Sequence, residues 1–149
     1  MSRIQTILVP VDFSEHSNYA LEYAIDLAKS MGAKIHLIHA YGLPTQFVGP
    51  YDVTPLPTEF FQQVRDSSAA RLEEAKGKVS AEGVPCDSTL ADGAPAEAIT
   101  DAAERVGADM IVIGTRGHTG LKHVLLGSVA ERVVRTAACP VLATRRPER

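Results

Sequence analysis

Short runs of apolar residues alternate along this chain with longer segments in which apolar side chains recur every three or four positions. The short runs are typical of buried strands, and the helical spacing is typical of amphipathic helices. We expect strands at residues 6–11, 34–41, 84–91, 108–113 and 140–144, and helices at residues 14–31, 58–82, 94–106 and 128–137. This alternation predicts an α/β fold in which a parallel sheet carries helices on both faces.

Local signals support the predicted helix ends. Ser14 can cap the first helix, and Pro95 is favoured in the first turn of the third. Gly32, Gly83 and Gly107 follow the last apolar positions of the first three helices, and glycine commonly ends a helix. The helix boundaries therefore agree with the spacing of the apolar residues.

The order of the strands predicts where a ligand would bind. Right-handed crossovers make 3-2-1-4-5 the economical order for five such strands. The winding reverses between the first and fourth strands, and ligands of doubly wound sheets bind beyond the carboxyl ends of the strands at such a reversal. Residues 10–12 end the first strand, and Gly114 follows the fourth. We expect a single doubly wound domain over residues 1–149 with its ligand crevice between these two strand ends.

Composition narrows the classes of partner. The 149 residues carry a formal net charge of −3 and a pI near 5.9, which gives no electrostatic support for non-specific nucleic-acid binding. No apolar run approaches the length of about 20 residues that spans a bilayer, and the first residues lack the apolar region of a signal peptide. We expect a cytoplasmic protein with no nucleic-acid or membrane partner, in which Cys86 and Cys139 are small buried apolar residues.

The stretch from Gly114 to Ser128 is rich in glycine and links the fourth strand to the fourth helix. Glycine permits positive φ angles and lets backbone amides approach a ligand, and the free N–H groups of a helix N-terminus attract anions. The stretch therefore indicates a phosphate cradle, although an ordinary glycine-rich loop would have the same composition. Its spacing, Gly-x2-Gly-x9-Gly-Ser, is neither that of a P-loop nor that of a dinucleotide fingerprint.

Three stretches resemble the universal stress protein family in its ATP-binding branch. They are the glycine-rich stretch with the Gly-Ser-Val-Ala-Glu-Arg-Val-Val at 127–134, the Ile-Leu-Val-Pro-Val-Asp-Phe-Ser at 7–14, and the Cys-Pro-Val-Leu at 139–142. The resemblance covers nearly the whole chain except residues 42–60. It implies an ATP site, and it implies a dimer, since members of this family commonly pair through the last strand.

The residues expected to bind the nucleotide lie near both ends of the chain. The Asp12 carboxylate can accept hydrogen bonds from ribose hydroxyl groups, or else it supports a helix cap at Ser14. Pro10 and Val11 would contact the base, and the resemblance alone implies that the backbone of Ala40 meets the adenine edge. The other members of the expected set surround the glycine-rich stretch, which would hold the phosphates: Ile113, Gly114, Arg116, Gly117, Gly127, Ser128, Val129 and Ala130.

Within that set Arg116 has two interpretations, a charged donor to phosphate or a solvated surface residue. His36 and His39 are three residues apart on a strand, so they point to opposite faces and cannot share a metal. Asp12 and Asp92 could meet at one edge of the sheet and help hold Mg²⁺ through water. The proline-rich residues 42–57 are either a lid over the site or an insertion.

We therefore expect an ATP-binding cytoplasmic protein of stress response or regulation without a dedicated catalytic base, and we leave slow ATP hydrolysis open. The first alternative is an enzyme that hydrolyses ATP or transfers adenylate in the same crevice. The second is a dimeric scaffold that does not depend on nucleotide.

The fifth strand is expected to form the partner surface. It would be an edge of the sheet, and an unprotected edge favours pairing with a second copy. We expect a homodimer built on residues 141–144, unless the tail residues 146–149 cover that edge.

Overall fold

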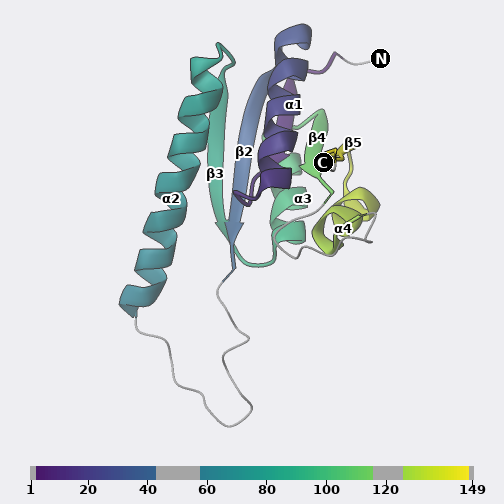
Figure 1. Cartoon of the computed structure of the whole chain (residues 1–149). Helices are drawn as coiled ribbons and strands as arrows, with labels where there is room; N and C mark the ends of the chain where they lie inside the picture. The colour runs from purple at the N-terminus through teal and green to yellow at the C-terminus, as the bar shows by residue number, and fades with distance from the viewer. Residues whose placement is uncertain (1–2, 43–57, 116–125, 148–149) are drawn as a thin grey trace.

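The structure, a computed structural model, describes residues 3–42, 58–115 and 126–147. The elements follow one another as β1 (Thr6–Pro10), α1 (Glu15–Met31), β2 (Lys34–Tyr41), α2 (Thr58–Ala81), β3 (Cys86–Asp92), α3 (Pro95–Val106), β4 (Met110–Gly114), α4 (Ser128–Thr136) and β5 (Val141–Thr144) (Figure 1). Strands and helices alternate as the pattern of apolar residues predicts. The expected lid or insertion at residues 42–57 falls, apart from Gly42, outside the described residues.

The sheet confirms the predicted topology. Its five strands are parallel and lie in the order β3-β2-β1-β4-β5. β1 is therefore central, with β2 on one side and β4 on the other, and the winding reverses between β1 and β4. This arrangement is the doubly wound α/β fold, in which the reversal opens a crevice at the carboxyl ends of the strands.

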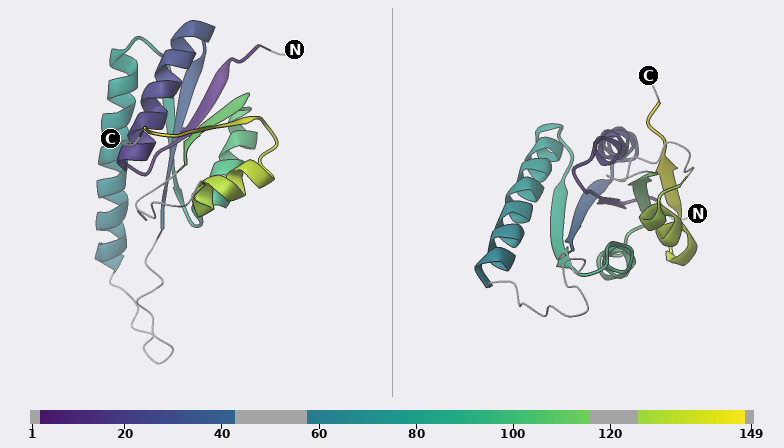
Figure 2. Two further views of the ribbon diagram at one scale, coloured as in Figure 1. Left: turned by 45° about the vertical axis from the view of Figure 1, so that its right-hand side comes forward. Right: turned by 60° about the horizontal axis from the view of Figure 1, so that its bottom comes forward.

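Alternation along the strands divides the core into two halves. In β1 the side chains of Ile7 and Val9 join a cluster with α1 and α2, whereas Leu8 between them joins a cluster with α3 and α4. Successive side chains of a strand point to opposite faces, so each face of the sheet acquires its own apolar layer. Helices α1 and α2 cover one face, and α3 and α4 cover the other (Figure 2).

The expected helix caps are present. The Ser14 side chain accepts a hydrogen bond from the Ser17 N–H at the start of α1. Gly32 and Gly107 adopt left-handed conformations, with φ of 67° and 64°, after the ends of α1 and α3. The capping interpretation of these residues is confirmed, because only a residue without Cβ enters this region freely.

Helix α2 buries less of its surface than its spacing predicts. The helical pattern places Phe61 and Val64 on the buried face, but both are only partly buried, and Phe60 is 37% exposed. Deep burial begins at Ser68 and continues at Leu72 and Val79. The first turns of α2 extend past the ends of the strands, where no sheet is available to cover them (Figure 1).

The two cysteines are less buried than predicted. Cys86 and Cys139 pack against the two core clusters but keep partly exposed surfaces, because each lies at an edge region of the sheet. Burial raises the pKa of the Cys86 thiol to about 11, and it raises the pKa of Cys139 as well. Both thiols are therefore protonated at neutral pH, which fits a packing role.

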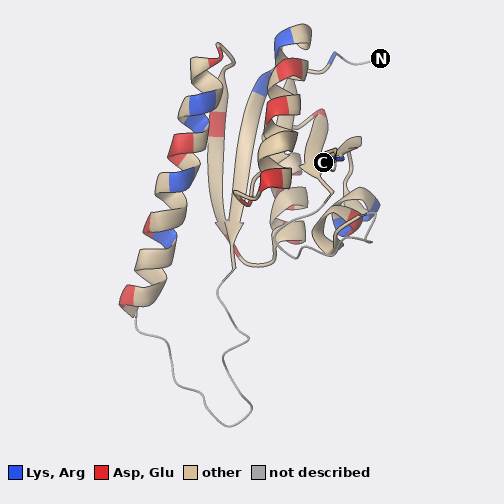
Figure 3. Cartoon of the chain, in the orientation of Figure 1, with Lys and Arg blue, Asp and Glu red and all other residues tan. Residues whose placement is uncertain are grey.

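The distribution of charge on α2 and the apolar character of the described helices bear on two classes of partner, charged molecules and membranes. Acidic and basic residues alternate along α2, so that helix offers no surface of a single sign (Figure 3). Among the described helices, none combines the length and apolar character that a bilayer crossing requires.

His36 makes stability depend on pH. Its Nε2 lies 2.7 Å from the Thr89 hydroxyl oxygen between β2 and β3, and burial lowers the pKa of His36 below its ordinary value of 6.5, with Lys34 acting in the same direction and Asp87 against it. The unfolded chain then binds the proton more tightly, so stability is full above pH 6.5 and falls as the pH drops below it.

We expect His36→Gln, whose amide can replace Nε2 toward Thr89, to lose less stability between pH 8 and pH 5 than the native chain. Urea unfolding at a series of pH values measures this difference. Parallel stability curves for the two proteins would contradict the role of His36.

Candidate functional site

A cavity of about 220 Å³ lies at the carboxyl ends of β1, β2 and β4. The first turns of α3 and α4 complete its wall. Ten residues of the predicted set line it: Pro10, Val11, Asp12, Ala40, Ile113, Gly114, Gly127, Ser128, Val129 and Ala130. Segments from the two ends of the chain thus meet at the reversal between β1 and β4, where the topology predicts a ligand crevice.

Two members of the predicted set, Arg116 and Gly117, lie outside the described residues. Thr115 and Gly127, on either side of the stretch that contains them, both line the cavity. The path of the chain from β4 to α4 therefore begins and ends at the cavity wall.

Hydrogen bonds organise the turn between β1 and α1 around Asp12. Its Oδ1 accepts from the Ser14 N–H at 2.9 Å and from the Ser14 hydroxyl at 2.5 Å. The Asp12 N–H donates to the Ser17 hydroxyl at 3.0 Å, and the Ser17 N–H donates to Ser14 Oγ at 3.2 Å. Asp12 supports the cap of α1, as the second interpretation of this residue predicts, and it also lines the cavity.

The next residue, Phe13, has an unusual backbone conformation. Its φ is 66°, the only positive φ at a described residue other than glycine. The left-handed region costs a residue with Cβ about 1–2 kcal/mol, and a bulky residue occupies it only where its surroundings hold it there. Phe13 is partly buried against the cluster under α1 and α2. Strain is thus stored directly beside Asp12.

The N-terminus of α4 borders the cavity. Gly127 is its N-cap residue, and the Gly127 N–H donates to the Thr115 carbonyl. That N–H is therefore hydrogen-bonded within the protein. The N–H groups of Ser128, Val129 and Ala130 belong to the first turn, in which a helix offers no internal acceptor. These three residues all line the cavity.

A close contact with α1 gives Gly114 a reason to be glycine that the sequence does not reveal. Neither Gly114 nor Gly127 has a positive φ. A Cβ at Gly114 would lie 2.8 Å from the His16 carbonyl oxygen and 3.0 Å from its carbon. The residue is small because the first turn of α1 crosses the end of β4 at close range, which brings Ser17 to the cavity wall as well.

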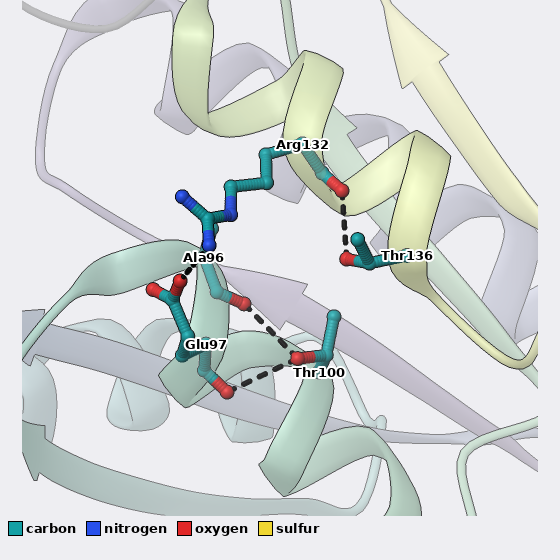
Figure 4. A network of polar contacts seen from close by, with 5 residues as sticks. All are labelled: Ala96, Glu97, Thr100, Arg132 and Thr136. Carbon is teal, nitrogen blue, oxygen red and sulfur yellow. Dashed lines mark hydrogen bonds and ion pairs between the residues drawn. The ribbon is translucent and has the colours of Figure 1, made fainter.

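An ion pair ties together the two helices whose first turns border the cavity. Arg132 of α4 pairs with Glu97 of α3, and both side chains are about half exposed (Figure 4). The hydroxyls of Thr100 and Thr136 donate to carbonyls within their own helices. Exposed ion pairs contribute little to stability, so the packing of the apolar cluster carries most of the contact between α3 and α4.

Six further residues line the cavity without having been predicted: Ser17, Ile38, His39, Pro95, Ile99 and Thr115. Ile38 and His39 directly precede Ala40 at the end of β2, so their position was available from the topology. Pro95 and Ile99 come from the first turns of α3. The apolar face of α3 predicts a core position for Ile99 but does not indicate that the core opens into a cavity there.

The cavity does not bring together Asp12 and Asp92, the two carboxylates that could have helped hold Mg²⁺. Asp12 lines it, but Asp92 does not. Within the described residues no cluster of three histidine, cysteine or acidic side chains could hold a metal ion. His36 and His39 interact with Thr89 and with the Val11 carbonyl, respectively, and so do not act together.

Comparison with known proteins gives a consistent match over the whole fold. Residues 3–145 match the model of the universal stress protein family. The universal stress protein MJ0531 of Methanocaldococcus jannaschii is 36% identical over 148 residues, which cover 96% of this chain and 83% of that protein. The solved structure of MJ0577 from the same organism has a TM-score of 0.84 and 27% identity, and the match covers 99% of this chain and 100% of the other.

Two further solved structures contain adenine nucleotides. A universal stress protein in complex with cAMP has a TM-score of 0.71 and 28% identity, with 96% of this chain and 98% of that chain covered. The universal stress protein from Archaeoglobus fulgidus in complex with dAMP has a TM-score of 0.66 and 26% identity, with 95% and 98% covered.

Proposed function

The chain belongs to the universal stress protein family, and on that premise we propose that it is a stress-response protein that binds ATP in the cavity at the ends of β1, β2 and β4. It acts as a single nucleotide-binding unit in the cytoplasm. The observation that carries this proposal is the convergence of Asp12 and the first-turn amides of α4 on one cavity. A carboxylate can accept hydrogen bonds from the ribose of a nucleotide, and a row of backbone amides can donate to its phosphates.

The electrostatics favour one orientation of the ligand. The negative charge of a triphosphate is repelled by the Asp12 carboxylate and attracted by the free amides and dipole of a helix N-terminus. The phosphates therefore extend toward Ser128, Val129 and Ala130, and the ribose lies toward Asp12. The base then lies toward the end of β2, where Ala40 lines the cavity.

The relatives support the class of ligand. Two universal stress proteins with the same fold were solved with cAMP and with dAMP. Both ligands combine adenine, a sugar and a single phosphate. For this chain, ATP extends that ligand toward the glycine-rich stretch that precedes α4.

Binding is favoured over catalysis. Of the described residues that line the cavity, Asp12 is the only carboxylate, and its Oδ1 accepts two hydrogen bonds from Ser14. A catalytic base has to position and deprotonate an attacking group, and a carboxylate that supports a helix cap is poorly suited to that task. ATP is therefore a bound ligand, and its hydrolysis is slow.

Isothermal titration of protein stripped of nucleotide tests the proposal. We expect ATP to bind with a dissociation constant below about 0.1 mM, a free energy of more than roughly 5 kcal/mol. Inorganic triphosphate should bind more weakly, because it lacks the ribose and the base that would lie toward Asp12 and β2. Absence of heat from ATP at millimolar concentration would contradict the proposed function, and repeated release of ADP would favour the enzyme.

A homodimer through β5 is the second part of the proposal. β5 lies at one edge of the sheet and pairs with β4 only. Arg146, in the tail, forms an ion pair with Glu15 at the start of α1, so the described tail runs toward α1 (Figure 2). An edge strand with unpaired backbone groups favours pairing with a second copy about a two-fold axis.

The backbone of β5 identifies which residue tests the dimer. The Pro140 carbonyl accepts a hydrogen bond from the Ile111 N–H in β4, and the Thr144 carbonyl accepts one from the N–H of Thr115, just after β4. Because the backbone groups of successive residues point to opposite sides of a strand, those of Ala143 point to the open edge. A proline at Leu142 would instead remove an N–H that faces β4 and would damage the sheet itself.

We expect the native chain to show about twice 16.0 kDa in light scattering at micromolar concentration. Ala143→Pro removes one outward N–H, which edge positions tolerate, and should shift the mass toward the monomer. Ala143→Ser retains the N–H and should remain dimeric. A native chain that stays monomeric would contradict the dimer.

A further inference from the structure

Three side chains from different elements are stacked behind the turn that carries Asp12. The ring of Phe13 lies 4.6 Å from the ring of His39 on β2, with an angle of 48° between the planes. The guanidinium carbon of Arg71 on α2 lies over the same ring, 4.3 Å from its centroid. The Phe13 ring thus contacts both strand β2 and helix α2.

His39 also fixes the backbone of the same turn. Its Nδ1 lies 2.7 Å from the Val11 carbonyl oxygen. A carbonyl can only accept, so the proton of this hydrogen bond belongs to Nδ1 and the neutral ring is held in one tautomer. The Val11 N–H donates to the Ile38 carbonyl at 2.8 Å. Both the N–H and the carbonyl of Val11 are therefore hydrogen-bonded to residues of β2.

These contacts act on the conformation of Phe13. With φ of 66°, this residue would leave the left-handed region if its ring were free. The peptide that joins Asp12 to Phe13 would then rotate, and the Asp12 carboxylate would move with it. The stack therefore holds in place a turn whose own backbone preference is different.

We propose that Arg71, Phe13 and His39 are positioning residues, which set the place of the Asp12 carboxylate and thereby the affinity for the nucleoside end of the ligand. This inference rests on the proposed nucleotide function. Phe13 and Arg71 do not line the cavity, so they act through the turn and not by contact with the ligand. An exposed residue of α2 thus influences a site that it does not line.

The test compares pairs of variants in titrations with ATP and with inorganic triphosphate. Phe13→Leu removes the ring and should weaken ATP binding roughly three- to tenfold. Phe13→Tyr retains an aromatic ring and should bind ATP as the native chain does. Arg71→Gln should weaken ATP binding about two- to fivefold. Arg65→Gln, at another exposed arginine of α2, is the matched control and should bind as the native chain does.

Inorganic triphosphate separates positioning from general damage. If the stack positions Asp12 for the nucleoside, affinity for triphosphate stays unchanged in Phe13→Leu and Arg71→Gln. Equal losses for ATP and triphosphate would overturn the inference, because they would report damage to the whole site. Should Phe13→Leu fail to fold, Arg71→Gln on the surface of α2 decides alone.

The failure of this inference differs from the failure of the proposed function. A native chain that binds ATP, with Arg71→Gln and Phe13→Leu equal to it, would overturn the inference and leave the function intact. A native chain that binds no nucleotide would overturn both.

Discussion

Replacement of Gly114 by alanine should lower the free energy of unfolding by about 1–3 kcal/mol or more. The added Cβ would lie 2.8 Å from the His16 carbonyl oxygen, and both the end of β4 and the first turn of α1 are backbone that cannot rotate away. Either element has to shift, and both border the cavity. We therefore expect Gly114→Ala to weaken ATP binding as well.

Gly77→Ala supplies the matched control for the same chemical change. Gly77 lies on α2, and a Cβ there would meet no atom within 4 Å. Alanine in a helix interior is favoured over glycine by about 0.5–1 kcal/mol, so this variant should be more stable than the native chain. Chemical denaturation measures the expected loss of stability in Gly114→Ala and the expected gain in Gly77→Ala. An unchanged stability in Gly114→Ala would show that α1 does not approach β4 as closely as the structure has it.

Asp12→Ala should have the largest effect on ligand binding. Loss of a hydrogen bond to a charged group costs about 1.5–3 kcal/mol, which corresponds to a decrease in ATP affinity of about 10- to 150-fold. Inorganic triphosphate should keep its affinity or bind slightly more tightly, since it has no ribose and is repelled by this carboxylate. Titration with the two ligands checks the difference.

The network around Ser14 requires a second variant at the same position. Asp12 Oδ1 accepts from both the N–H and the hydroxyl of Ser14, so alanine removes support for the cap as well as the contact to the ligand. Asp12→Asn retains an oxygen for Ser14 and loses the charge. We expect its thermal stability to be near native and its ATP affinity to lie between those of Asp12→Ala and the native chain. Equal losses of ATP and triphosphate in both variants would show that Asp12 only shapes the turn.

The fold was accessible from the sequence because local and global signals agree in this chain. Apolar runs mark the strands, Ser14 and the glycines at 32 and 107 mark helix ends, and right-handed connections leave few possible strand orders. The predicted boundaries differ from the observed ones by at most two residues. For example, β3 begins at Cys86 and β4 at Met110, where ladder pairing starts.

The site was only partly accessible, because several of its features depend on contacts between distant segments. The sequence motif includes Gly114 but does not reveal that α1 crosses it. The left-handed conformation of Phe13 runs against the preference of a bulky residue, so no propensity predicts it. The sequence excludes a metal site shared by His36 and His39, but the contact of His39 with the Val11 carbonyl forms only when β1 and β2 pair.

A crystal structure of the chain with a non-hydrolysable ATP analogue would show the orientation of the ligand. We expect the ribose within hydrogen-bond distance of the Asp12 carboxylate and the phosphates at the N–H groups of Ser128, Val129 and Ala130. An analogue bound elsewhere on the protein, or bound in this cavity with its phosphates toward Asp12, would contradict this expectation.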